Sequence, residues 1–216
     1  SSDVCSSDLN GAVAMDGTAI KKVGTLEEIK KEFPDAEYVD AKGGVIMPAF
    51  INTHEHIYSA MARGLSIKGY DPKGFLDILD GMWWTIDRHL TNEQTRQSAR
   101  ATYLDSIKNG VTTVFDHHAS FGEIKDSLFA IEDAAKEMGV RTCLCYEISD
   151  RDGMDKARAA VMENASWIKH ALADDTDMIA GMMGMHAQFT ISDETRELAA
   201  ANKPAEVGYH IHVAEG

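Results

Sequence analysis

Hydrophobic and polar positions follow two different patterns along this chain. Near the N-terminus, short alternating stretches flank Asp16-Gly17, a dipeptide that favours a tight turn between two strands. Beyond Gly43-Gly44, apolar and β-branched runs are separated by longer amphipathic segments, which is the pattern of strand-helix-strand units feeding a parallel sheet. We therefore expect a small β layer over residues 10–44 and an α/β domain over residues 45–216.

Apolar runs in the second region are candidates for buried parallel strands. They cover residues 45–52, 111–117, 140–147, 179–185 and 207–213. A closed barrel of eight strand-helix units takes about 250 residues by itself. The chain is therefore either an open sheet of five strands or part of a longer barrel protein.

Capping signals predict where several helices begin and end. Thr25 and Thr91 are each followed three residues later by Glu or Gln, the spacing of a capping box. Ser192 is a further candidate N-cap. Before Gly139, apolar residues recur at steps of three and four, and this glycine is a stop signal.

Histidines stand at the ends of the first and last candidate strands. Side chains alternate faces along a strand, so His54 and His56 point the same way and can hold one cation. His212 offers a third nitrogen, and Glu215 follows it by three residues. Carboxyl ends of parallel barrel strands converge on one mouth. We predict that His54, His56 and His212 bind one divalent metal ion, with Glu215 as the catalytic residue that moves protons.

Three neutral imidazoles and an open position suit zinc, with ferrous iron as the alternative. Such an ion lowers the pKa of bound water from about 16 to about 7 and makes hydroxide available at neutral pH. Two-metal barrel hydrolases commonly bridge their metals with a carboxylated lysine on the fourth strand. No lysine occurs between Met178 and Thr190, so a single ion is expected.

Further polar residues lie at strand ends, where each can orient a substrate. They are Asp116, His117, His118, Glu147, Asp150, Arg151 and His186. Among these we expect His186 and His118 to bind the substrate. His210 lies one layer below His212 and is assigned a packing or supporting role. Glu55 alternates away from its two neighbours.

The long segment between the first two candidate strands can wall a binding pocket at the same face. It contains Trp83 and Trp84, which we interpret as core residues of an additional helix. Residues 1–9, by contrast, have neither a strand nor a helix period. We expect them to be non-native or disordered and exclude them from the fold.

Charge and composition restrict the partners. With 35 acidic and 21 basic side chains, the net charge of −14 argues against nucleic acid and anionic membranes and favours a neutral or cationic small molecule. No apolar run approaches the roughly 20 residues that cross a bilayer, and no signal peptide is recognisable. We expect a cytoplasmic protein in which Cys143 and Cys145 are reduced core thiols.

Several of these motifs resemble the amidohydrolase superfamily, in its deaminase and chlorohydrolase branch. Residues 48–56 (PAFINTHEH) resemble its first-strand metal motif, and residues 210–215 (HIHVAE) its fifth-strand motif. Residues 186–190 are similar to the segment with a substrate-contacting histidine. Within the branch, Met82–Trp84, Asp116–His118 and Tyr146–Asp150 are most similar to the SsnA-type aminohydrolases. Ala49 stands where the family usually has glycine.

The resemblance implies a metal-dependent-hydrolase (β/α)8 TIM barrel, with about five of its eight units in this chain, and a small β-sandwich portion over residues 10–44. It also implies a histidine on the sixth strand and a metal-binding aspartate on the eighth, both beyond Gly216. The chain by itself is therefore expected to bind metal weakly and to be inactive. The full-length protein can also be a homodimer, a possibility that the sequence does not decide.

The leading functional hypothesis is an aminohydrolase that releases ammonia from a small nitrogenous heterocycle. Metal-bound hydroxide would attack an sp² carbon, Glu215 would transfer protons, and His186 would steady the tetrahedral centre. Hydrolytic ring opening or dehalogenation by the same site is one alternative. A non-catalytic metal-binding fragment is the other.

Overall fold

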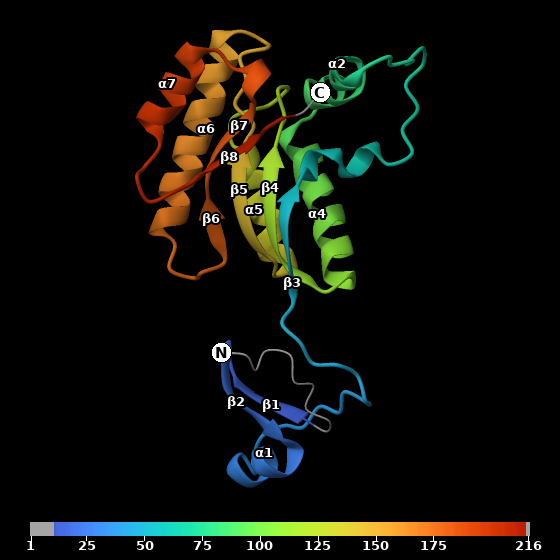
Figure 1. Cartoon of the computed structure of the whole chain (residues 1–216), viewed down its shortest axis with the longest axis vertical. Coiled ribbons are helices and arrows are strands. Elements are labelled where there is room, and N and C mark those ends of the chain that lie inside the picture. The colour runs from blue at the N-terminus through green and yellow to red at the C-terminus, as the bar shows by residue number, and fades with distance from the viewer. Residues whose placement is uncertain (1–10, 215–216) are drawn as a thin grey trace. The chain divides into compact units, whose positions relative to one another are not determined.

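A computed structural model describes residues 11–214 of the chain (Figure 1). The chain divides into two compact units, Ser1–Pro48 and Ala49–Gly216. The expectations for residues 1–9 and for Glu215 fall outside the described residues.

The first unit contains a β-hairpin followed by a short helix. Strands β1 (Gly11–Asp16) and β2 (Ala19–Thr25) pair in antiparallel fashion. Gly17 has a φ of 57°, the left-handed conformation that the predicted turn requires. Helix α1 (Leu26–Glu32) begins at Thr25, which forms the predicted capping box with its N3 residue.

The second unit is built on parallel strands. They are β3 (Phe50–Glu55), β4 (Val111–His118), β5 (Arg141–Tyr146), β6 (Ile179–Gly181), β7 (Met183–Ala187) and β8 (Tyr209–His212). The order β3-β4-β5-β6 forms one sheet, and β7 pairs with β8 in a second. An isolated parallel bridge between Ile148 and Met185 connects the segment after β5 to β7.

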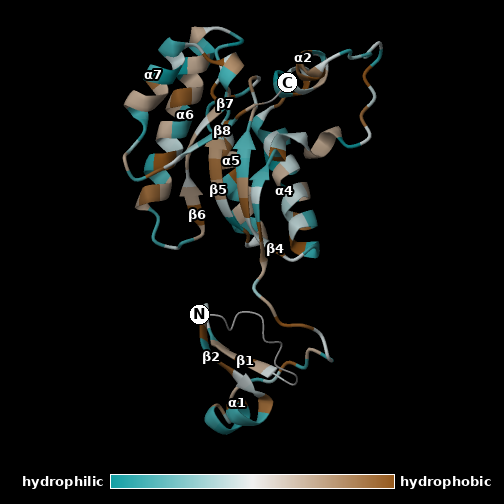
Figure 2. Ribbon diagram, in the orientation of Figure 1, coloured by the Kyte–Doolittle hydropathy of each residue, from teal (hydrophilic) through white to brown (hydrophobic). Residues whose placement is uncertain are grey.

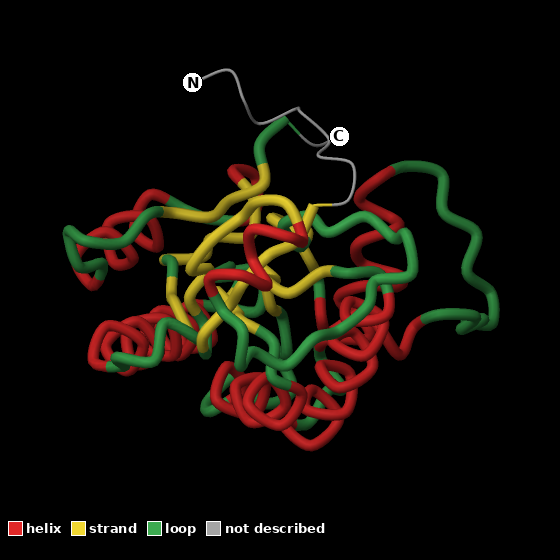
Figure 3. Tube along the Cα trace, turned by 90° about the horizontal axis from the view of Figure 1, so that it is seen from below, coloured by secondary structure: helices red, strands yellow, loops and turns green. Residues whose placement is uncertain are grey.

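Helices of the second unit lie around the outside of its strands (Figure 3). They are α2 (Phe75–Ile78), α3 (Trp84–Asp87), α4 (Asn92–Lys108), α5 (Ser127–Met138), α6 (Met154–Ala173) and α7 (Asp193–Asn202), with a π-helical turn η2 (Leu79–Trp83) and 3-10 turns η1 (Ile57–Ala62) and η3 (Gln188–Thr190). The predicted caps at Thr91 and Ser192 are confirmed, as is the stop at Gly139. No helix within residues 11–214 is long and apolar enough to cross a bilayer.

Strand boundaries differ most from the prediction in two places. The first strand was expected over residues 45–52 but begins at Phe50, because its parallel partner begins only at Val111. Residues 45–49 have no ladder partner, and Val45 is 86% exposed. The fourth predicted strand is interrupted at Met182, where β6 ends and β7 begins.

A buried asparagine joins β5 to β7. The Asn164 Oδ1 atom accepts hydrogen bonds from the backbone N–H groups of Tyr146 (3.0 Å) and Gly184 (3.2 Å), and its Nδ2 donates to the Tyr146 carbonyl (2.9 Å). Asn164 belongs to α6, along which polar and apolar residues alternate (Figure 2). Around it lies a continuous apolar core that includes Leu144 and Trp167. This core fixes the strands whose ends carry the polar residues.

Candidate metal centre

The three predicted metal ligands come together at the carboxyl ends of β3 and β8. The Nε2 atoms of His54 and His212 are 3.2 Å apart, and the ring centroid of His56 lies 4.7 Å from that of His54 and 5.1 Å from that of His212. His54 belongs to β3, and His56 follows the last residue of this strand. The closest approach is that of His54 and His212. Within the described residues, His56 and His212 share one group of neighbouring donor atoms, whereas His54 belongs to another group.

The orientation of His56 is fixed by a neighbouring strand. Its Nδ1 atom lies 2.8 Å from the backbone oxygen of His117, and a carbonyl oxygen can only accept a hydrogen bond. The Nδ1 atom therefore carries the proton, and Nε2 is the nitrogen that can bind a metal. After His56 the chain turns, and the buried Asp116 carboxylate accepts a hydrogen bond of 2.7 Å from the Ile57 N–H.

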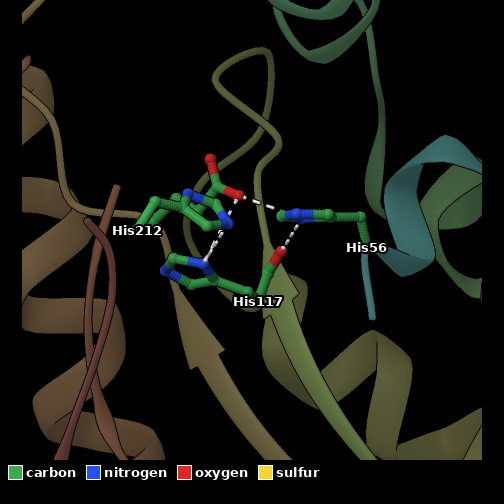
Figure 4. A group of neighbouring side chains, drawn as sticks. His56, His117 and His212 are labelled. Carbon is green, nitrogen blue, oxygen red and sulfur yellow. Dashed lines mark hydrogen bonds and ion pairs between the residues drawn. The ribbon is translucent and has the colours of Figure 1, made fainter. Parts of the chain in front are cut away.

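His117 belongs to the same cluster, although the sequence did not single it out as a ligand. It is the next-to-last residue of β4, is fully buried, and its Nδ1 lies 3.4 Å from His212 Nε2 (Figure 4). Its ring also stacks on His210 at 4.5 Å between centroids. The sequence feature that could have predicted His117 as a member of the cluster is its position near the end of a parallel strand, where the first strand also carries its histidines.

His210 contacts one of the predicted ligands, and its packing or supporting role stays a prediction. Its Nε2 lies 2.8 Å from His54 Nδ1, so one of the two atoms donates to the other. Burial and neighbouring imidazoles lower the pKa of His210 to about 4, and burial lowers that of His117 well below its usual value. Both rings are neutral at pH 7, the form that binds metals.

Glu147 places a carboxylate among these imidazoles. Its Oε1 lies 3.1 Å from His56 Nδ1 and 3.8 Å from His117 Nδ1, and its Oε2 lies 3.7 Å from His186 Nε2. Burial disfavours its charge, but the surrounding imidazoles outweigh burial and hold the pKa of Glu147 well below its usual range. Glu147 is therefore an ionised carboxylate. The sequence placed it only among several polar residues at strand ends.

Two overlapping sets of donor atoms can hold a metal ion in the described part of the chain. His56, His117, Glu147 and His212 form the first set, and His54, His117 and His210 form the second; within each, the donor atoms lie within 4.8 Å of one another. The Nε2 of His117 and the Nδ1 of His212 are buried and have no hydrogen-bond partner. Nitrogen donors with one carboxylate suit zinc or another divalent transition metal. The residues present therefore fit the expected ion.

His186 lies beside this cluster, and its orientation is fixed. It belongs to β7, its Nδ1 lies 2.8 Å from Thr190 Oγ1, and its ring centroid lies 5.6 Å from that of His212. The ring of Trp84 is 6.2 Å away on another side. The Arg151 guanidinium lies over the Trp84 ring and forms a buried ion pair with Asp87. The Trp84 ring therefore lies beside both His186 and Arg151.

His118 faces away from the cluster. It is fully buried, with its ring centroid 6.3 Å from that of Tyr58 and 5.7 Å from that of Tyr146. Burial lowers the pKa of His118 to about 3. Alternation along β4 explains why its ring and that of His117 occupy different surroundings. Substrate contact by His118 stays a prediction.

Glu55 accepts a hydrogen bond from Asn52 Nδ2 at 2.8 Å.

A comparison with known families identifies the class of protein. Residues 45–216 match the Amidohydrolase family, so this chain belongs to that family. The resemblance seen in the sequence is confirmed. The strands and helices described above form part of the family's barrel, as predicted.

Among curated proteins, the chain is similar to deaminases. It is 27% identical over 205 residues to the 5'-deoxyadenosine deaminase of Methanococcus maripaludis strain C5, covering 93% of this chain and 45% of that protein. It is 25% identical over 213 residues to the 5-methylthioadenosine/S-adenosylhomocysteine deaminase of Desulforudis audaxviator, covering 98% and 46%. The chain thus spans about half the length of the curated relatives it matches.

Solved structures show the same fold. Guanine deaminase of E. coli superposes with a TM-score of 0.75 at 18% identity, covering 95% of this chain and 47% of that chain. A mutant of atrazine chlorohydrolase from Arthrobacter aurescens TC1, complexed with zinc and atraton, gives 0.73 at 21% identity, covering 94% and 48%. At this identity the likeness concerns the fold alone.

Proposed function

We propose that this chain forms part of the active site of a metal-dependent aminohydrolase that releases ammonia from a small nitrogenous heterocycle. The observation that supports this most directly is the approach of His54 and His212, whose Nε2 atoms come within 3.2 Å from separate strands. Imidazoles in contact at strand ends are typical of a metal centre. The two curated relatives described above are both named as deaminases of adenosine derivatives, which favours deamination.

Each residue has a distinct role in this proposal. His54, His56 and His212 hold the ion, which when bound polarises the substrate and activates water at neutral pH. His186 orients the heterocycle, because its ring lies beside His212 and is held by Thr190. His118 is retained as a second substrate-binding residue, acting from its buried position.

Glu215 is the proposed catalytic residue for proton transfer. It would accept a proton from water and deliver protons to the ring nitrogen and the leaving amine. Zinc is the proposed ion, and iron is the alternative. The net charge of −14 favours a neutral or cationic substrate and disfavours nucleic acid, anionic membranes and phosphate-rich ligands. Cytoplasmic location and a homodimer of the whole protein are parts of the same proposal.

The test is an ammonia-release assay on the zinc-loaded full-length protein that contains this sequence. The panel comprises adenosine derivatives, guanine, pyrimidines, and amino- and chlorotriazines. We expect ammonia from at least one aminated heterocycle, and Glu215→Gln should retain zinc while losing nearly all turnover, at least about a thousandfold. Glu206→Gln, at an exposed position before β8, is the matched control and should be fully active.

Several outcomes would contradict the proposal. Chloride release without ammonia would assign the site to dehalogenation, and hydrolysis without either product would indicate ring opening. Bound metal without turnover on any compound would favour a non-catalytic protein. Normal turnover in Glu215→Gln would exclude that residue as the proton carrier.

A further inference from the structure

The carboxylate of Glu147 lies between the metal-binding and substrate-binding parts of the proposed site. Its side chain is 5% exposed, and its backbone N–H donates to the His118 carbonyl at 2.7 Å, which fixes the chain where β5 ends. From this point Oε1 faces His56 at 3.1 Å and Oε2 faces His186 at 3.7 Å. These histidines come from different strands, so Glu147 is their common neighbour.

Burying a carboxylate costs free energy unless nearby donors or cations compensate for lost hydration. Around Glu147 the compensating groups are imidazoles, and the closest is the protonated Nδ1 of His56. That same Nδ1 donates its hydrogen bond to the His117 carbonyl, and Glu147 Oε1 lies 3.1 Å from it as an ion-pair contact. The carboxylate therefore contacts the His56 ring at Nδ1 and leaves Nε2, the nitrogen that can bind a metal, on the other side of the ring.

We propose that Glu147 is a positioning residue of the metal centre, which holds the His56 ring with Nε2 toward the ion and keeps His186 beside the same site. Carboxylates that accept from the far nitrogen of a metal-bound histidine fix its tautomer and orientation. Glu147 adds a contact to a histidine of the substrate-binding side. This inference rests on the proposed function, because it takes His56 as a metal ligand and His186 as a substrate contact.

Zinc affinity is the decisive measurement, read by competition with a chromogenic chelator and independent of turnover. Glu147→Gln should weaken zinc binding by about 10- to 100-fold, the usual effect of removing a carboxylate that supports a metal-bound histidine. The visible spectrum of the cobalt(II)-substituted chain should also change, because the ring of His56 is no longer held in one orientation. In the full-length protein the same variant should raise KM, through His186.

Glu163→Gln is the matched control. Glu163 is also a buried carboxylate, but it accepts from the backbone N–H groups of Asp126 (2.9 Å) and Leu128 (3.0 Å), outside the histidine cluster. Its loss should lower stability and leave zinc affinity and the cobalt spectrum unchanged. Circular dichroism checks that each variant is folded.

Glu147→Asp is the second variant, since it keeps the charge but withdraws the carboxylate by one methylene. It should bind zinc with an affinity between those of the wild type and Glu147→Gln, and it decides the matter if Glu147→Gln does not fold. Wild-type zinc affinity in the folded Glu147 variants would overturn this inference alone. A wild-type chain that binds no zinc would overturn the proposed metal centre as well, whereas absent turnover with normal zinc binding would contradict only the proposed reaction.

Discussion

At the scale of single residues, burial determines the chemistry of this site. Water is excluded from His117 and partly from His210, so both imidazoles stay neutral and keep a nitrogen lone pair for a cation. Glu147 is nearly as buried as His117 but stays ionised, because the imidazoles of His117, His186 and His56 lie around its carboxylate. Within one cluster, the buried imidazoles are therefore neutral, whereas the buried carboxylate is negatively charged.

The same reasoning predicts that the cysteines of β5 are unreactive. Burial raises the pKa of Cys143 to about 12 and that of Cys145 well above its usual value. Cys5 is the third cysteine of the chain, and Cys5→Ser removes it so that only the two thiols of β5 react. In this variant, the native chain should react with a thiol reagent at pH 8 at least about a hundredfold more slowly than the chain in denaturant. Rapid labelling of the folded variant would show that β5 is accessible.

At the scale of elements, a close approach of backbones holds β7 against β5. A Cβ atom at Gly184 would lie 2.3 Å from the Tyr146 carbonyl oxygen, a contact that no rotamer can relieve. Asn164 binds the backbone of both strands from α6. Tyr146 directly precedes Glu147, and Gly184 lies two residues before His186. The contact between the two strands therefore also sets the distance between Glu147 and His186.

Gly184→Ala should therefore destabilise the chain by about 1–3 kcal/mol, the usual cost of overpacking. Urea unfolding measures the difference. Gly208→Ala is the control, because its new Cβ would meet only the flexible end of Met182 at 3.3 Å. Equal stability of the two variants would mean that β5 and β7 can separate without loss.

At the scale of the whole molecule, the histidines discussed here all belong to the second unit. Residues 49–216 contain the parallel strands, the large apolar core and the proposed ligands. The first unit has its own hairpin and helix, with Ile29 as a buried apolar residue.

Residues 49–216 expressed alone should consequently fold and bind zinc with the affinity of the complete chain. Calorimetric unfolding and the chelator competition check the two expectations. A folded segment that no longer binds zinc would show that residues 1–48 contribute to the metal centre.

The sequence by itself determined the features that depend on neighbours along the chain. The spacing of His54 and His56 predicted that their rings would be neighbours, capping boxes located Thr25 and Thr91 at helix starts, and paired motifs identified the family. These signals are local, because each depends on residues a few positions apart. The class of fold followed from the same periodicities.

Tertiary structure decided which strand-end residues meet and how deeply each is buried. His117 and His118 are adjacent, yet one joins the histidine cluster and the other packs between tyrosines. Glu147 reaches His56 only because β5 pairs with β4, and β4 with β3. Such distances depend on register and packing between segments far apart in sequence, which no short pattern of residues encodes.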